Sequence, residues 1–394
     1  MTRGIPALVR PALLIWARDS TGLSIAEVSK KAHIRAEVLE EWEQGNQRPT
    51  IPQLRKLGEI YKRPLSVFFL SEPPKGFDPQ REFRRLPGVS PETESPELRL
   101  ALRTALYRRE AAKDLYERLG ESFATIEHGL NPNDDPDAVG LRIRELLGIT
   151  WEEQLEWTSP HAALNEWRDA IEKLGVLVFQ TGGVALKEMR GTSVPEGPLP
   201  VIVLNSADAP QGRIFTLIHE FIHLLFARAG HQTSRIEGKR KPEDRVLERA
   251  SNRYTAATLL PRKEFLSEVS RRPDVFTGSD EALRRFANRV KVSAETILRR
   301  LLSLNRISTT LYSQKRRAWQ QHPWYTPNQS KGGPPIQVRV VSSVGRSFVS
   351  LILEGYQRNV ISGSDVSDYL GVQLRHLDKI ASELVTRPPT PAIN

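Results

Sequence analysis

The chain has 394 residues, which is enough for about two to four domains, and it contains no cysteine. The absence of cysteine excludes disulfides, cysteine-ligated zinc and thiol catalysis, and it fits a reducing compartment. The net charge of +10 favours polyanions or acidic partners. There is no run of 18 apolar residues, and Arg10 and Pro11 interrupt the apolar N-terminus, so we expect a cytoplasmic protein without a membrane span or signal peptide.

The N-terminal part, residues 1–72, is predicted to be an all-α domain. Apolar spacing and turn residues indicate helices at 8–19, 24–32, 35–44 and 52–61. Ser24 and Glu27 are spaced as a capping box for the second helix, and Gly45 ends the third. Because only a short turn separates the second and third helices, we predict a helix-turn-helix with Leu39 and Trp42 in its core.

The third helix of this domain is rich in glutamate, and carboxylates repel DNA phosphates. Six polar or basic residues in and around it are nevertheless candidates for DNA contacts: Lys30, Lys31, Arg35, Gln44, Asn46 and Arg48. The alternative role for the domain is dimerisation or docking of another protein.

The middle of the chain is predicted to change from a linker to a mixed α and β domain. Residues 73–135 are expected to form a linker and a long helix, the helix at 96–129. Residues 136–320 are then expected to form one domain. Helices are predicted at 137–147 and 160–174, and strands at 176–180, 189–193 and 199–205. An edge strand of such a sheet could hold an extended peptide.

The sequence His-Glu-x-x-His occurs at residues 219–223, within an apolar stretch that lacks Gly and Pro from Ile214 to Ala229. A helix therefore places His219 and His223 one turn apart on one face, where two imidazoles can hold one Zn²⁺. Glu220 is the candidate general base for activating a water molecule. Mn²⁺ is the alternative metal for such a site.

A carboxylate on a second helix is the predicted third ligand, because the places for a downstream Gly and His are taken by Phe226 and Ala229. Glu248 is the first choice and Glu243 the second. Asn252, one turn after Glu248, is expected to hydrogen-bond a ligand. The polar segment 230–242 between the two helices is a candidate cover for the site, and its His231 is expected to be a surface histidine.

Residues 213–225 and 248–261 together resemble the two motifs of the ImmA/IrrE family of metallopeptidases. The resemblance implies a zincin-like domain in which His219, His223 and Glu248 bind the metal and Glu220 is the catalytic carboxylate. The N-terminal domain resembles the XRE-type helix-turn-helix that precedes such peptidases. Mild departures from the second motif leave the metal-binding residues intact: Ser251, Tyr254, Thr255 and Leu260.

Residues 284–317 contain ten Lys or Arg against one acidic residue, Glu295. They predict a basic surface for nucleic acid or an acidic partner, with Arg299, Arg300, Arg316 and Arg317 as candidates, or else a solvated face. Residues 336–386 are predicted to form a small, mainly helical C-terminal domain that begins with a strand at 336–342.

The predicted fold class is thus α+β and predominantly α. The predicted function is that of a zinc-dependent endopeptidase with a DNA-binding-like domain. The resemblance implies cleavage of a repressor, often of the helix-turn-helix type, in phage, mobile-element or stress control. DNA and a second copy of the chain are further candidate partners. The alternative is a helix-turn-helix regulator or antitoxin-like binding protein without hydrolysis.

Overall fold

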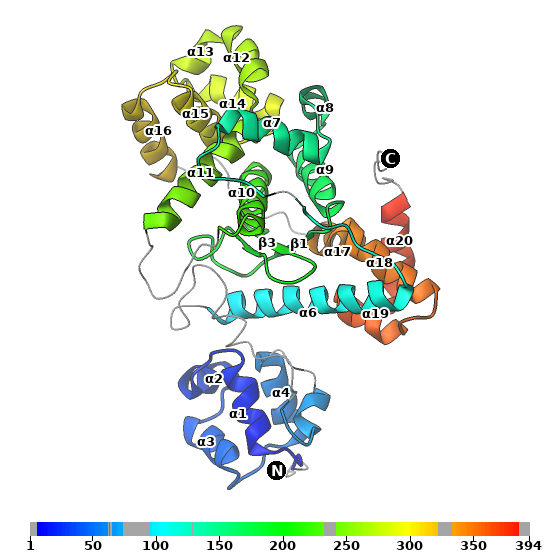
Figure 1. Cartoon of the computed structure of the whole chain (residues 1–394). Helices are drawn as coiled ribbons and strands as arrows, with labels where there is room; N and C mark the ends of the chain where they lie inside the picture. Colours follow the sequence, from blue (N-terminus) through cyan, green and yellow to red (C-terminus); the bar gives the residue numbers. More distant parts are fainter. Residues whose placement is uncertain are drawn as a thin grey trace. The chain divides into compact units, whose positions relative to one another are not determined.

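The computed structural model describes residues 6–61, 63, 65–73, 95–127, 129–231, 242–321 and 333–385. These residues divide into two units, one containing the described residues up to Thr104 and the other beginning at Ala105. Each unit is considered by itself. The fold is α+β and predominantly helical, which confirms the predicted class (Figure 1). Within these residues no single helix is long and apolar enough to cross a membrane, and the one helix pair that passes a length and composition test is bent by 106°.

The first unit contains the predicted helix-turn-helix. Its elements are α1 (Pro11–Asp19), α2 (Ile25–Ala32), α3 (Ala36–Gln44), α4 (Ile51–Tyr61), the 3₁₀ turn η1 (Leu65–Phe69) and the first part of α6 (Pro96–Leu119). The Ser24 side chain accepts a hydrogen bond from the Glu27 N–H, and the Glu27 carboxylate accepts one from the Ser24 N–H, so the capping box is formed. Leu39 and Trp42 are both 3% exposed, which confirms their predicted place in the core.

An ion pair joins the first and third helices of this unit. Arg18 Nε on α1 lies 2.7 Å from Glu43 Oε1 on α3, and both side chains are largely buried. Glu43 is therefore occupied inside the domain. The acidic character that α3 presents to a partner is smaller than its composition suggests.

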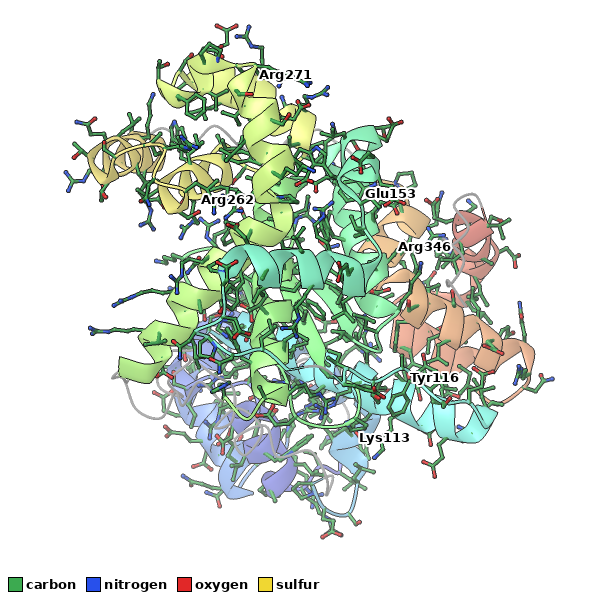
Figure 2. The ribbon with its side chains drawn as sticks, turned by 45° about the horizontal axis from the view of Figure 1, so that its top comes forward. Lys113, Tyr116, Glu153, Arg262, Arg271 and Arg346 are labelled. Atoms are coloured by element: carbon green, nitrogen blue, oxygen red, sulfur yellow. The ribbon has the colours of Figure 1, made fainter. Side chains whose placement is uncertain are left out.

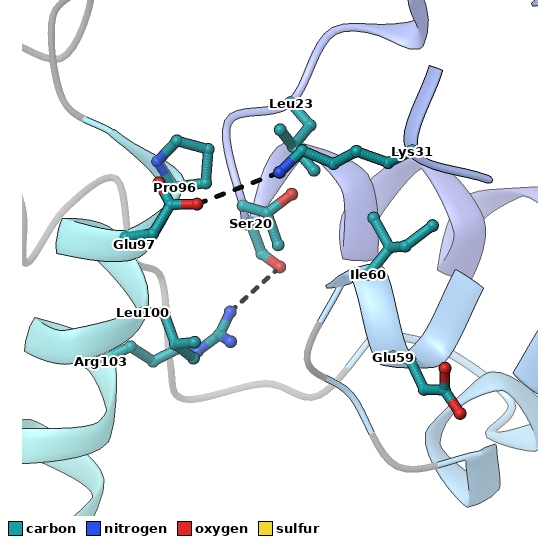
Figure 3. Close-up of a pocket in the computed structure, with 10 residues that line it drawn as sticks. Ser20, Leu23, Lys31, Glu59, Ile60, Pro96, Glu97, Leu100 and Arg103 are labelled. Carbon is teal, nitrogen blue, oxygen red and sulfur yellow. Dashed lines mark hydrogen bonds and ion pairs between the residues drawn. The ribbon is translucent and has the colours of Figure 1, made fainter. Parts of the chain in front are cut away.

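A pocket of about 370 Å³ lies between the helix-turn-helix and the start of α6, within the first unit (Figure 3). Its lining carries both signs of charge: Lys31 and Arg103 are basic, and Glu59 and Glu97 are acidic. Arg103 is 8% exposed and donates a hydrogen bond to Ser20 Oγ at 3.5 Å. Burial lowers the pKa of Arg103 to about 10.

The second unit is built around a small sheet and a buried helix, α10 (Pro210–Arg228). The later part of α6 precedes them. The helices between α6 and the sheet are α7 (Pro136–Leu147), α8 (Trp151–Glu156) and α9 (Pro160–Glu172). The helix predicted at 96–129 ends ten residues early, at Leu119, because Gly120 adopts a positive φ of 69°. The short helix α8 was not predicted, although Thr150 and Glu153 form its capping box.

The sheet has three strands in the order β1-β3-β2, and all three were predicted within two residues. They are β1 (Leu177–Thr181), β2 (Gly191–Val194) and β3 (Val201–Asn205). β1 runs parallel to β3, with Leu177 opposite Val201, whereas β2 runs antiparallel to it, with Ser193 opposite Ile202. β3 is central and entirely buried, so β1 and β2 are the two edges.

The remaining helices extend the unit in two directions (Figure 1). One group begins with α11, and the other ends the described chain. They are α11 (Pro242–Leu259), α12 (Arg262–Ser270), α13 (Pro273–Phe276), α14 (Asp280–Val290), α15 (Ala294–Ser303), α16 (Thr309–Gln321), α17 (Ile336–Val344), α18 (Arg346–Gln357), α19 (Gly363–Leu370), η2 (Leu374–His376) and α20 (Leu377–Val385).

The strand predicted at 336–342 is wrong, because these residues form helix α17. The alternating Val and polar residues suggested a strand, but Val340 and Val344, four residues apart, are the two buried positions. α17 lies beside β1 (Figure 1), and Gln180 Nε2 on β1 donates to the Ser342 carbonyl oxygen at 2.8 Å. Tertiary packing thus overrides a pattern that local spacing left ambiguous.

A buried ion pair links α9 to the C-terminal helices. Arg168 Nε lies 2.8 Å from Glu172 Oε1, and the two side chains are 3% and 2% exposed. Arg168 also donates to the carbonyl oxygens of Val178 and Ser342, and the Ser347 N–H donates to Glu172. Arg346, labelled in Figure 2, adds a contact of 3.6 Å to Asp169.

The pKa of Asp169 predicts a pH-dependent stability. Burial, together with the neighbouring Glu172 carboxyl, raises this pKa from 3.8 to about 7, although Arg346 opposes the shift. Between about pH 4 and pH 7 the folded protein therefore holds a proton that the unfolded chain has released. We expect the free energy of unfolding to fall as the pH rises through this window, by at most about 1.4 kcal/mol per pH unit for this group.

Asp169→Asn removes this titration, so its unfolding free energy should depend less steeply on pH than that of the wild type. Urea denaturation of both proteins at pH 5, 6 and 7.5 measures the difference. Parallel pH dependences in the two proteins would show that Asp169 does not titrate in this range.

Candidate metal centre

Helix α10 holds both histidines of the predicted motif. Pro210 occupies its first turn, and the apolar residues around the motif are buried, Phe221 and Ile222 completely. His219 and His223 lie one turn apart on the face that remains partly open, with side chains 14% and 11% exposed. Their Nε2 atoms are 3.1 Å apart. The apolar sequence therefore fixes the helix, and the helix brings the two imidazoles together.

Helix α11 supplies the third group of the cluster. Glu248 Oε2 lies 3.5 Å from His219 Nε2, and Glu248 Oε1 lies 3.5 Å from His223 Nε2. One ligand atom from each of the three residues lies within 4.8 Å of the others. The predicted runner-up Glu243 has a side chain outside the described part of the structure, so Glu243 stays a prediction.

The three groups fit a Zn²⁺ ion. Two imidazole nitrogens and one carboxylate oxygen are a common zinc donor set. Ligands about 2.1 Å from a tetrahedral ion lie about 3.4 Å from each other. The observed separations of 3.1–3.5 Å between side-chain atoms agree with that spacing. Burial raises the pKa of Glu248, but hydrogen bonds from His219 and His223 lower it below its ordinary value.

Glu220 lies next to the first histidine and is held by a residue of the sheet. Ser193 Oγ, on edge strand β2, donates a hydrogen bond of 2.7 Å to Glu220 Oε2. Ser193 is 7% exposed. Sequence reasoning missed this residue as part of the site. The predicted strand at 189–193 beside the active helix was the one signal that could have identified it.

Asn252 contacts the ligand-bearing turn rather than a ligand atom. Its Nδ2 donates to the backbone carbonyl oxygen of Glu248 at 2.7 Å, and its Oδ1 accepts from Arg299 Nη1 at 3.3 Å. His219 Nδ1 is buried and has no hydrogen-bond partner among the described residues. His231 is half-buried with its ring against Phe226, and segment 232–241 lies outside the described residues.

The predicted basic surface at 284–317 is largely neutralised by ion pairs. Arg300 is not on the surface: it is 2% exposed, donates to the Leu260 carbonyl oxygen and pairs with Asp137. Arg316 lies 3.6 Å from Glu295, and Arg317 is exposed. Other basic residues of the segment pair with acids that lie outside it, Arg289 with Glu268 and Lys315 with Asp280, so the charge count of one segment overstated the free positive charge.

The six candidate DNA contacts of the first unit are all exposed, and they lie in or beside α2 and α3: Lys30, Lys31, Arg35, Gln44, Asn46 and Arg48. Lys31 Nζ lies 4.0 Å from Glu97 Oε1, and Asn46 Nδ2 donates to Gln44 Oε1 at 3.2 Å. These residues are therefore available to a partner, and their role in binding DNA stays a prediction.

Comparison with known families identifies two parts of the chain. Residues 171–302 match the family model described as the IrrE N-terminal-like domain, Peptidase_M78, and residues 14–68 match the one described as helix-turn-helix. The first match contains β1 to β3, α10, α11 and all residues of the cluster. No curated protein matches the chain. The two matches agree with the fusion that the sequence motifs predict.

Proposed function

We propose that this chain, which joins an IrrE N-terminal-like domain of the Peptidase_M78 family to a helix-turn-helix domain, is a zinc-dependent endopeptidase. The observation that carries the proposal is the convergence of His219, His223 and Glu248 beside Glu220. His219, His223 and Glu248 would hold the metal, with Mn²⁺ as the alternative to Zn²⁺.

A bound Zn²⁺ would polarise the scissile carbonyl group and lower the pKa of a water molecule. Glu220 would accept a proton from the attacking water and deliver it to the leaving amine. Ser193 supports this assignment, because its hydrogen bond to Oε2 fixes the carboxylate in one rotamer and leaves Oε1 for the proton. Ser193 is therefore proposed to orient Glu220.

Strand β2 is the proposed binding edge for the substrate backbone. In the described part of the chain β2 pairs with β3 alone, and its Ser193 contacts Glu220. The opposite edge, β1, lies beside α17. A peptide added antiparallel or parallel to β2 would use main-chain hydrogen bonds, which suits an extended segment of a protein.

The proposed substrate is a repressor protein of the helix-turn-helix type, in phage, mobile-element or stress control. The first unit is proposed to guide the peptidase to its target by docking DNA or a protein through α2 and α3. The exposure of its six candidate residues supports such docking. A helix-turn-helix regulator without hydrolysis is the competing proposal, and the complete cluster with Glu220 favours the peptidase.

Metal content is the decisive first measurement. We expect the purified wild-type protein to contain about one zinc per chain, because three donors converge on one point. His223→Ala should lose the metal, because it removes one of two nitrogen donors. Elemental analysis after purification without chelator measures both. A wild type that stays metal-free even after incubation with Zn²⁺ would remove the peptidase proposal.

A further inference from the structure

We propose that Arg299 is a positioning residue of the metal site. Its guanidinium group connects α15 to the turns of α10 and α11 that carry the metal ligands, and thereby sets the separation of His219 and Glu248. The inference rests on the metal site of the proposed function. It assigns to the site a residue whose sequence context suggests a nucleic-acid surface.

The contact with α11 passes through Asn252. Arg299 Nη1 donates to Asn252 Oδ1 at 3.3 Å, and Asn252 Nδ2 donates to the Glu248 carbonyl oxygen at 2.7 Å. The second hydrogen bond spans one helical turn, so it fixes the Asn252 side chain against the backbone of the ligand residue. Arg299 therefore holds the backbone from which the Glu248 side chain extends.

The contact with α10 passes through Phe215. The Arg299 Cζ atom lies 5.5 Å from the centre of the Phe215 ring, within the range of a cation–π interaction. Phe215 stacks on His219, with ring centres 6.2 Å apart and an angle of 25° between the planes. Phe215 lies one turn before His219, so the guanidinium supports the ring that backs the first ligand.

Arg299 is itself held in place from two other directions. Its Nη2 lies 3.1 Å from Glu295 Oε1, one turn earlier on α15, and its Cζ lies 6.0 Å from the ring centre of Tyr312 on α16. The Tyr312 hydroxyl donates to the same Glu295 oxygen at 3.3 Å. The side chain is only 27% exposed. A residue with this many fixed contacts is suited to support a site rather than to reach for phosphates.

Arg316 is the matched control. It is also an arginine of the 284–317 segment and also approaches Glu295, at 3.6 Å, but it is 52% exposed. Among the described residues, no hydrogen bond joins Arg316 to Asn252 and no cation–π interaction joins it to Phe215. Removing either arginine deletes one positive charge from the same region. Only Arg299→Ala deletes the connection to α10 and α11.

The direction in which Arg299→Ala changes the zinc affinity distinguishes a positioning role from a purely electrostatic one. A cation close to a bound Zn²⁺ repels it, so charge alone predicts that Arg299→Ala binds zinc more tightly. Positioning predicts weaker binding, because the ligands lose their preset separation. Replacing residues that support metal ligands typically weakens metal binding about 10- to 100-fold. Arg299 supports the backbone of Glu248 and the ring of Phe215 rather than a ligand atom. We therefore expect a loss of zinc affinity at the lower end of this range, about tenfold.

The experiment is a Zn²⁺ titration of the full chain against a chromophoric chelator, for wild type, Arg299→Ala, Arg316→Ala and Asn252→Ala. We expect about tenfold weaker binding for Arg299→Ala and an affinity within about twofold of wild type for Arg316→Ala. Adding Asn252→Ala to Arg299→Ala should cost less than the two separate losses combined, since the residues act in series.

Unchanged or tighter zinc binding by Arg299→Ala would overturn the inference, and so would equal losses in the two arginine variants. If Arg299→Ala does not fold in the metal-free state, Asn252→Ala carries the test, with weaker binding expected and unchanged binding overturning the inference. A wild type that binds no Zn²⁺ would overturn the metal site itself, whereas normal wild-type binding with an unaffected Arg299→Ala would overturn the positioning role alone.

Discussion

Glu220→Gln is expected to abolish proteolysis while the protein keeps its zinc. The glutamine amide fills the same space and can still accept a hydrogen bond from Ser193 Oγ through its carbonyl oxygen. It cannot accept a proton from water at neutral pH, so the general-base step is lost. General acid–base catalysis typically contributes about 10²- to 10⁴-fold, and we expect at least such a loss in the rate of repressor cleavage. Gel analysis and mass spectrometry of a candidate repressor measure the rate.

Glu248→Gln is the informative comparison for that experiment. It changes a carboxylate to an amide at the same cluster, but at a residue proposed to hold the metal. It should lose zinc and activity together, whereas Glu220→Gln should lose activity alone. Cleavage that survives in Glu220→Gln, at wild-type zinc content, would refute the proposed role of Glu220.

Glu172→Ala is expected to destabilise the second unit by about 3–5 kcal/mol, because it removes one partner of a buried ion pair. Arg168 and Glu172 are almost fully buried, and the remaining guanidinium would keep only carbonyl partners. Burial raises the pKa of the Glu172 carboxyl, although Arg168 and the Ser347 N–H oppose that shift. Denaturant unfolding measures the loss.

Asp114→Ala provides a control with the same four-residue spacing in an exposed ion pair. Asp114 and Arg118 are also four residues apart on one helix, with 3.2 Å between charged atoms, but their side chains are 55% and 48% exposed. An exposed pair of this kind contributes about 0.2–1 kcal/mol. If Asp114→Ala and Glu172→Ala lowered the free energy of unfolding by similar amounts, burial would not make the Arg168–Glu172 pair more important for stability than an exposed pair.

The cluster of candidate metal ligands could be predicted from the sequence, because the spacing of its two histidines is local. His219 and His223 are four residues apart, and a helix turns that spacing into a 3.1 Å separation of ring nitrogens. To predict Glu248 as the third ligand, it was enough to expect a second helix, and its packing angle did not have to be known. Ser193 was missed because its contact with Glu220 spans 27 residues and depends on which strand forms the edge of the sheet.

The errors have the same physical origin. The sequence alone suggests that Arg300 is a surface charge, because its partner Asp137 lies 163 residues earlier in the chain. The local pattern of α17 suggests a strand. The contacts of α17 with β1 and α20, which the local pattern does not contain, determine which of its valines are buried. Local spacing determines helices that have one long apolar face. Local spacing does not determine which charged residues form ion pairs. It also does not determine whether a short segment of mixed apolar and polar residues becomes a helix or a strand.

The position of α17 beside β1 also bears on how the peptidase part can be produced alone. β1 ends the sheet, and an uncovered strand edge recruits strands from other chains. The matched family region stops at residue 302, before the helix that meets this edge. A fragment cut there would lose the Ser342 carbonyl oxygen, which accepts hydrogen bonds from both Gln180 and Arg168. We therefore expect a fragment that contains the metal cluster to need helices α17 to α20 for its solubility, and to end after Val385.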